Sequence, residues 1–137
     1  MTKRYLLTGL CLLMCSLLHA QSDAEYTQWV TKANRHYKAK KYKESAEAYS
    51  KAFAALGGKG YGTDRYNAAC SWSLAGNIDS AFFQLERIAT KLYYADYNEL
   101  TTDHDLDNLH KDARWQLLCT QVKQNETNFN KPLAAML

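Results

Sequence analysis

Proline is almost absent from this 137-residue chain, and glycine is scarce. The single proline, Pro132, lies near the C-terminus, so no proline interrupts a helix earlier in the chain. Four of the six glycines fall within residues 57–62, and this cluster indicates an internal loop. The dipeptide Gly76-Asn77 indicates a second, tighter turn. The sequence therefore predicts long helices separated by these two breaks.

Several motifs that carry enzymatic chemistry are also missing. The chain has no Cys-x-x-Cys or His-x-x-x-His spacing for zinc, no nucleophile elbow and no dinucleotide-binding glycine pattern. The glycine-rich loop at 57–62 follows a predicted helix and lacks the Lys-Ser/Thr step of a phosphate-binding loop. We therefore predict a protein that is not an enzyme, with no catalytic residues, no metal site and no cofactor.

One short segment has the spacing of a calcium loop. Asp103, Asp105 and Asp107 follow the Asp-x-Asp-x-Asp pattern, but Asn108 stands where the loop needs glycine and Arg114 where it needs glutamate. Without the turn glycine and the bidentate carboxylate, calcium binding is disfavoured. We expect these aspartates to form turns and helix caps instead.

Acidic residues are absent from the first 20 positions, which begin with Lys3 and Arg4 and continue with an apolar run over residues 6–18. This order, ending at Ala20 and Gln21, is typical of a cleaved secretory signal, and the run is shorter than the ~20 residues of a membrane-spanning helix. An uncleaved amphipathic anchor and a lipidated Cys11 or Cys15 are the alternatives. We predict a signal peptide over 1–20 and a periplasmic or secreted protein.

Beyond this segment the chain has little net charge. Without Lys3 and Arg4, 15 basic residues stand against 14 acidic ones. This balance gives no reason to expect binding to nucleic acid or to an anionic membrane surface. We also expect no membrane span after cleavage. Cys70 and Cys119 remain in this part, where they either form one disulfide or serve as small apolar residues on helix faces.

Apolar residues recur at steps of three and four, which is the period of an α-helix. The pattern predicts helices over 23–38, 42–56, 64–75, 78–91 and 112–124, with a short turn of helix within 95–110. Thr63-Asp64, Asn77 and Asp112 are candidate N-caps. We therefore expect an all-α domain over residues 21–124, followed by a flexible tail over 125–137.

Two of the predicted hairpins repeat one arrangement of aromatic and small residues. In the first, Trp29, Tyr42 and Tyr49 take aromatic places, and small residues lie between them. In the second, Gly76 marks the turn. The small residues are Ala33, Ala46 and Ala52 in the first hairpin, and Ala69 and Ala81 in the second.

This arrangement resembles the tetratricopeptide repeat, whose period is ~34 residues. The acidic segment 96–109 and the following Asp112-Ala113-Arg114-Trp115 are similar to the segment that closes many bacterial tetratricopeptide proteins. The resemblance implies two helical hairpins and a C-terminal capping helix, a fragment of a right-handed α-solenoid. Stacked hairpins of this kind share one core, because a single hairpin cannot bury its apolar face.

In such a solenoid the first helix of each hairpin lines a concave groove. The resemblance places eight residues there: Val30, Asn34, Tyr37 and Lys38, with Tyr66, Asn67, Cys70 and Ser73. Rings and amides together suit an extended peptide. The lysine of the carboxylate clamp used by chaperone-binding repeats is replaced by Val30, so that function is not implied. The alternative is that these residues pack against the final helix.

We therefore expect a non-catalytic interaction module of the cell envelope that binds a protein or peptide through its concave face. The alternative is a structural or regulatory subunit of an envelope enzyme, docked through the apolar tail 132–137. Lys38, Lys40, Lys41 and Lys43 form a basic cluster at the first hairpin turn. That cluster is either a solvated surface or a contact for an acidic partner.

Overall fold

The computed structural model describes residues 21–134, with side chains to residue 131, and these residues form helices joined by turns and loops, without any strand. The helices are residues 21–38, α2 (Tyr42–Ala55), α3 (Gly62–Leu74), α4 (Ile78–Lys91), α5 (Tyr97–Thr102), the 3-10 helix η1 (His104–Leu109) and α6 (Ala113–Ala134). The predicted all-α class is confirmed. The predicted signal peptide, residues 1–20, lies outside the described residues.

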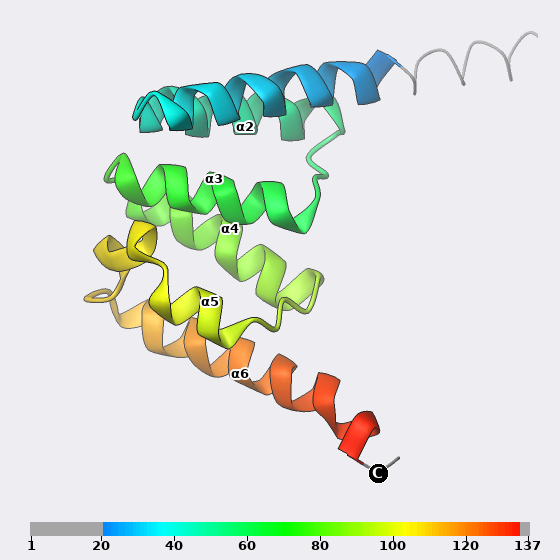
Figure 1. Ribbon diagram of the computed structural model, residues 1–137, viewed down its shortest axis with the longest axis vertical. Helices are drawn as coiled ribbons and strands as arrows, with labels where there is room; N and C mark the ends of the chain where they lie inside the picture. The colour runs from blue at the N-terminus through cyan, green and yellow to red at the C-terminus, as the bar shows by residue number, and fades with distance from the viewer. Residues whose placement is uncertain (1–20, 135–137) are drawn as a thin grey trace, which may run out of the picture.

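The helices form successive layers in one stack (Figure 1). The helix of residues 21–38 and α2 form the first layer, α3 and α4 the second, and α5, η1 and α6 close the other end. Two apolar clusters lie between these layers, and α3 contributes to both of them. Its Ala68 belongs to the cluster of the first hairpin, whereas Tyr66 and Ala69 belong to the larger cluster with α4, η1 and α6.

Small residues lie where the helices meet. The five alanines singled out in the sequence, Ala33, Ala46, Ala52, Ala69 and Ala81, have no exposed surface. Between α2 and α3, the buried hydroxyl oxygens of Ser45 and Ser71 lie 3.0 Å apart and share a hydrogen bond. Short side chains at these places leave room for neighbouring helix backbones to approach. Protein interiors are packed so closely that a change of even one methylene group in such a place affects the packing.

Two of the three predicted helix caps are confirmed. Asn77 Oδ1 accepts the backbone N–H of Ser80 at 3.1 Å, and Asp112 Oδ1 accepts that of Arg114 at 2.9 Å. The prediction for Thr63-Asp64 is wrong, because α3 begins earlier, at Gly62, and has no side-chain cap. Asp64 instead accepts a hydrogen bond from the hydroxyl group of Tyr26 in the first layer.

The segment 125–134, predicted as a flexible tail, continues α6 as far as Ala134. Asn125 explains this difference, because the residue is only 7% exposed and its side-chain amide donates to the backbone carbonyls of Ala89 at 2.8 Å and Tyr94 at 2.9 Å. These bonds fasten the middle of α6 to the end of α4. Within the described residues, no helix is long and apolar enough to cross a membrane.

Candidate functional site

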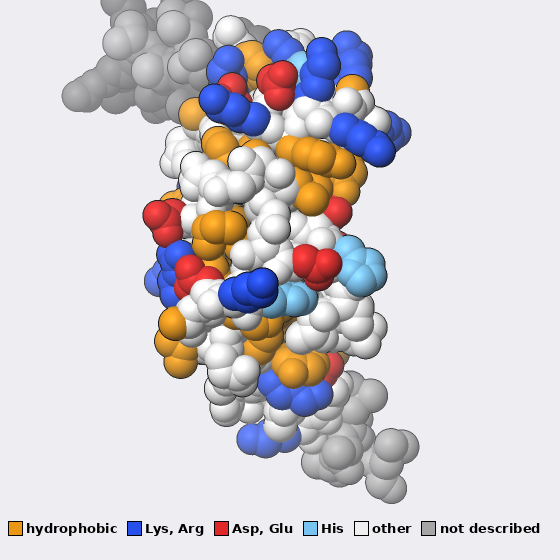
Figure 2. Space-filling model, turned by 90° about the vertical axis from the view of Figure 1, so that its left-hand side faces the viewer, with side chains coloured by type: hydrophobic (Ala, Val, Ile, Leu, Met, Phe, Trp, Pro, Cys, Tyr) orange, Lys and Arg blue, Asp and Glu red, His pale blue; other side chains and the backbone are white. Residues whose placement is uncertain are grey.

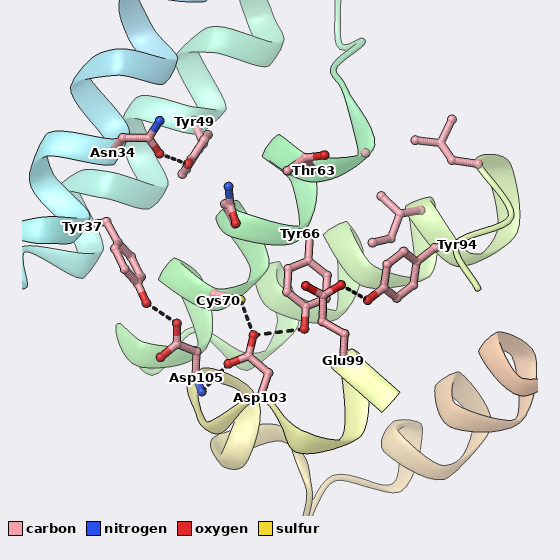
Figure 3. A pocket seen from close by; sticks show the side chains of 14 residues that line it. Asn34, Tyr37, Tyr49, Thr63, Tyr66, Cys70, Tyr94, Glu99, Asp103 and Asp105 are labelled. Carbon is pink, nitrogen blue, oxygen red and sulfur yellow. Dashed lines mark hydrogen bonds between the residues drawn. The ribbon is translucent and has the colours of Figure 1, made fainter. Parts of the chain in front are cut away.

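A hollow of about 650 Å³ lies between the first hairpin, α3 and the segment that contains α5 and η1 (Figure 3). Its floor is formed by buried residues of three helices: Tyr49 from α2, Tyr66 and Cys70 from α3, and Ile88 from α4. Exposed residues such as Asn34 and Glu99 form its rim. The hollow therefore combines an apolar base with a polar edge.

Five of the eight residues predicted for the concave groove line this hollow: Asn34, Tyr37, Tyr66, Asn67 and Cys70. The structure thus brings together side chains from the helix 21–38 and from α3. The amide oxygen of Asn34 accepts the Tyr49 hydroxyl hydrogen at 2.5 Å, and this bond joins the two helices of the first hairpin.

The other three predicted residues lie elsewhere. Val30 packs against the apolar cluster of the first hairpin, and Lys38 is exposed beyond the edge of the hollow. Ser73 has no exposed surface, and its carbonyl oxygen accepts the side-chain amide of Asn108 at 2.9 Å. Ser73 cannot line a groove because the η1 segment covers this part of α3.

Three tyrosine hydroxyl groups in the hollow each donate to a carboxylate (Figure 3). Tyr37 donates to Asp105, Tyr66 to Asp103 at 3.0 Å, and Tyr94 to Glu99 at 2.7 Å. Tyr94, Glu99, Asp103 and Asp105 are not among the residues predicted from the sequence for a binding site. The signal in the sequence is the aspartate spacing at 103–107, which predicts turns and helix caps.

That interpretation is correct for part of the segment. Asp103 caps η1, since its Oδ1 accepts the backbone N–H of Asp105 at 3.0 Å. Asp107 is exposed and lies 3.3 Å from Nδ1 of His104. The three aspartates therefore do not converge on one point as in a calcium loop, because only Asp103 and Asp105 face the hollow.

The hollow carries negative charge without a counter-charge. No Lys, Arg or His lines it, and within the described residues none of Glu99, Asp103 and Asp105 forms an ion pair. The pKa of Tyr37 is raised above its ordinary value, mainly by burial and secondly by the hydrogen bond to Asp105. Burial also raises the pKa of Tyr66, and the Tyr94 pKa is raised by burial and by its bond to Glu99. These hydroxyl groups therefore remain protonated donors at neutral pH.

Cys70 lies at the base of the hollow, with its sulfur 3.6 Å from Oδ2 of Asp103. Burial and the neighbouring Asp103 raise the pKa of this thiol, so it is protonated and a poor nucleophile at neutral pH. Cys70 and Cys119 are both buried free thiols, and the disulfide alternative is not realised. Cys70, Asp103 and Asp105 place ligand atoms within 4.8 Å of one another, close enough to hold a metal ion. A metal there would compete with the hydroxyl groups of Tyr37 and Tyr66 for the same carboxylates.

The predicted basic cluster lies apart from the hollow. Lys38, Lys40, Lys41 and Lys43 are all exposed around the first hairpin turn. Figure 2 shows Lys and Arg side chains gathered over this end of the stack. None of these lysines lines the hollow, so a ligand there meets only negative and neutral groups.

Comparisons with protein-family models, with curated proteins and with solved structures found no match for this chain.

Proposed function

We propose that this protein is a non-catalytic binding module whose hollow receives a positively charged side chain, presented by an extended segment of another protein. The observation that carries the proposal is the set of three carboxylates, Glu99, Asp103 and Asp105, which converge on one tyrosine-lined hollow without a cationic partner in the described chain. A guanidinium or ammonium group from outside supplies the missing charge.

The size and lining of the hollow suit such a ligand. Its volume of about 650 Å³ falls within the range of small-ligand sites. The rings of Tyr37 and Tyr94 are partly exposed where they line the hollow and can lie beside a cation, and each is held in place by its hydroxyl bond to a carboxylate. The side-chain NH2 group of Asn34, at the exposed rim, can donate to a backbone carbonyl beside the charged side chain, while its oxygen stays bonded to Tyr49.

The positive charge of the ligand determines how strongly the hollow should prefer it to a neutral analogue. A cation over an aromatic ring gains about 0.5–2 kcal/mol, depending on how far it is desolvated. A charge-assisted hydrogen bond to a carboxylate is worth about 1.5–3 kcal/mol when it is formed away from water. Because the rim of the hollow is exposed, we take the lower ends of both ranges together, about 2 kcal/mol or roughly thirtyfold in affinity. A peptide with arginine should therefore bind well over tenfold more tightly than its glutamine analogue.

We also propose that the chain is a divergent tetratricopeptide protein of the cell envelope. Three features support this: the five fully buried alanines at the repeat positions, the stacked hairpins, and the order of residues 1–20, which is typical of a secretory signal. In this account the acidic segment 96–109 both caps the stack and supplies the carboxylates of the hollow.

The proposal is tested with two synthetic peptides, Ac-Ala-Ala-Arg-Ala-Ala-NH2 and its Gln analogue, titrated into the purified ¹⁵N-labelled protein. We expect the arginine peptide to shift the amide signals of Tyr37, Tyr66 and Asp105, with little change at α6. Raising the salt concentration should weaken this binding, because opposite charges at a rim are screened over ~10 Å at 0.1 M.

Two variants distinguish binding in the hollow from non-specific attraction to the charged surface of the protein. Glu99→Gln removes one rim charge, and a pair of charges about 4 Å apart contributes about 1 kcal/mol in water, or roughly fivefold in affinity. Glu47→Gln removes an equally exposed charge on α2, away from the hollow, and should leave the affinity unchanged. Equal losses in both variants, or shifts scattered over the whole surface, would contradict the proposal.

A further inference from the structure

A second, smaller hollow carries the opposite charge. It has a volume of about 280 Å³ and lies between the loop that follows α2, the start of α3 and the end of α4. Its charged lining consists of Lys59, Arg65, Arg87 and Lys91, with no Asp or Glu. Leu92 lines both hollows, so the two sites lie on either side of one side chain.

Arg65 is the central group of this site. The residue is only 3% exposed, yet both of its hydrogen-bond acceptors are neutral: Gln84 Oε1 and the carbonyl oxygen of Gly58, each at 2.6 Å. The guanidinium group also lies over the ring of Phe53, 4.3 Å from its centroid. Buried charges in proteins are normally paired with an opposite charge, and here the described chain supplies none.

The neighbouring cations add further positive charge that no carboxylate of the described chain pairs with. Arg87 Nη2 also approaches the carbonyl oxygen of Gly58, at 3.4 Å, so two guanidinium groups converge on one acceptor. Lys91 lies one turn after Arg87 on α4, and like charges at this spacing repel each other. Within the described residues none of the four cations forms an ion pair. Burial and the nearby Arg87 both lower the pKa of Arg65, the direction that an uncompensated charge produces.

We infer that this hollow is a binding site for a phosphate-type oxyanion, either the free ion or a phosphoryl group on a larger molecule. Guanidinium groups match the geometry of phosphate oxygens, and a doubly charged anion offsets more of the repulsion than a carboxylate does. Arg65 supplies the fixed, buried charge of the site. Lys59, Arg87 and Lys91 are exposed and complete it from the rim.

The test uses the full chain with inorganic phosphate, methyl phosphate and acetate, at constant ionic strength maintained with sodium chloride. Isothermal titration calorimetry and thermal unfolding report binding and stabilisation. Arg65 holds the loop through Gly58, so its replacement risks unfolding, and the exposed Arg87→Gln is the informative variant. Lys111→Gln, which removes an exposed charge elsewhere, is the matched control.

We expect saturable phosphate binding, a rise of the melting temperature, and an affinity about tenfold lower in Arg87→Gln than in Lys111→Gln. Methyl phosphate that binds as tightly as phosphate identifies a phosphoryl group as the ligand, and weaker binding identifies the free ion. Acetate binding equal to that of phosphate, the absence of saturation, or equal losses in the two variants would overturn the inference. Because this site does not share its charged residues with the tyrosine-lined hollow, either proposal can fail alone.

Discussion

The hydrogen bond between Tyr66 and Asp103 joins α3 to η1 at the floor of the tyrosine-lined hollow, and its energy can be measured with a double-mutant cycle. The hydroxyl group lies 3.0 Å from Oδ2 of Asp103, and Tyr66 is only 7% exposed. Tyr66→Phe removes the donor, and Asp103→Ala removes the acceptor. A hydrogen bond to a charged group contributes about 1.5–3 kcal/mol, and the lower value applies because Asp103 is only partly buried.

The single variants differ for a structural reason. Tyr66→Phe should lower the free energy of unfolding by about 1.5 kcal/mol. Asp103→Ala should cost about 1 kcal/mol more than that, since its Oδ1 also caps η1 through the backbone N–H of Asp105. The double variant should be less destabilised than the sum of the two by about 1.5 kcal/mol, the coupling energy of the bond.

Urea unfolding followed by circular dichroism provides the free energies. The control cycle pairs Tyr66→Phe with Asp96→Ala, because Asp96 also caps a helix, through Glu99 N–H at 2.8 Å, but does not bond to Tyr66. In the control cycle, the losses of unfolding free energy in the two single variants should sum to the loss in the double variant within about 0.5 kcal/mol. A Tyr66–Asp103 coupling no larger than that of the control cycle would refute the described floor of the hollow.

Three further predictions concern packing and ionisation. Leu106→Ala in η1 should cost about 2–5 kcal/mol because this side chain is fully buried, whereas the exposed Leu117→Ala should stay within about 0.5 kcal/mol, both by urea unfolding. Asn125→Ala should cost about 1–3 kcal/mol by leaving two carbonyl groups without a donor, while the exposed Gln124→Ala has little effect. The Cys70 pKa is raised in the folded state, so its contribution to stability is present below the unfolded pKa of ~8.5 and is lost as the pH rises above it. Between pH 7.5 and 9.5 the wild type should therefore lose about 1 kcal/mol more than Cys70→Ala, measured by urea midpoints, and equal losses would contradict the raised pKa.

Local pattern was sufficient to predict most helices, because their apolar residues recur with the period of 3.6 that places them on one helix face. It was not sufficient for the end of α6. The segment after 124 is polar, and its helical state depends on Asn125 reaching carbonyl groups of Ala89 and Tyr94, more than 30 residues earlier. No property of the segment itself reports that contact.

The residues of the candidate site also differ in whether the sequence alone predicts them. Asn34, Tyr37 and Asn67 can be predicted from the resemblance to the tetratricopeptide repeat, which implies that their helices line a groove. The carboxylates were missed because the path of residues 96–109 across α3 is set by long-range burial of Leu106 and Leu109. The same path covers Ser73, which the repeat alignment alone places in an open groove.

The most direct test of the tyrosine-lined hollow is the ratio of dissociation constants for the glutamine and arginine pentapeptides, measured at low salt. The proposed function predicts a ratio above about ten, which falls as sodium chloride is added. A ratio near one with measurable binding of both peptides would show that charge does not select the ligand. Binding of neither peptide would remove the hollow as the site of recognition.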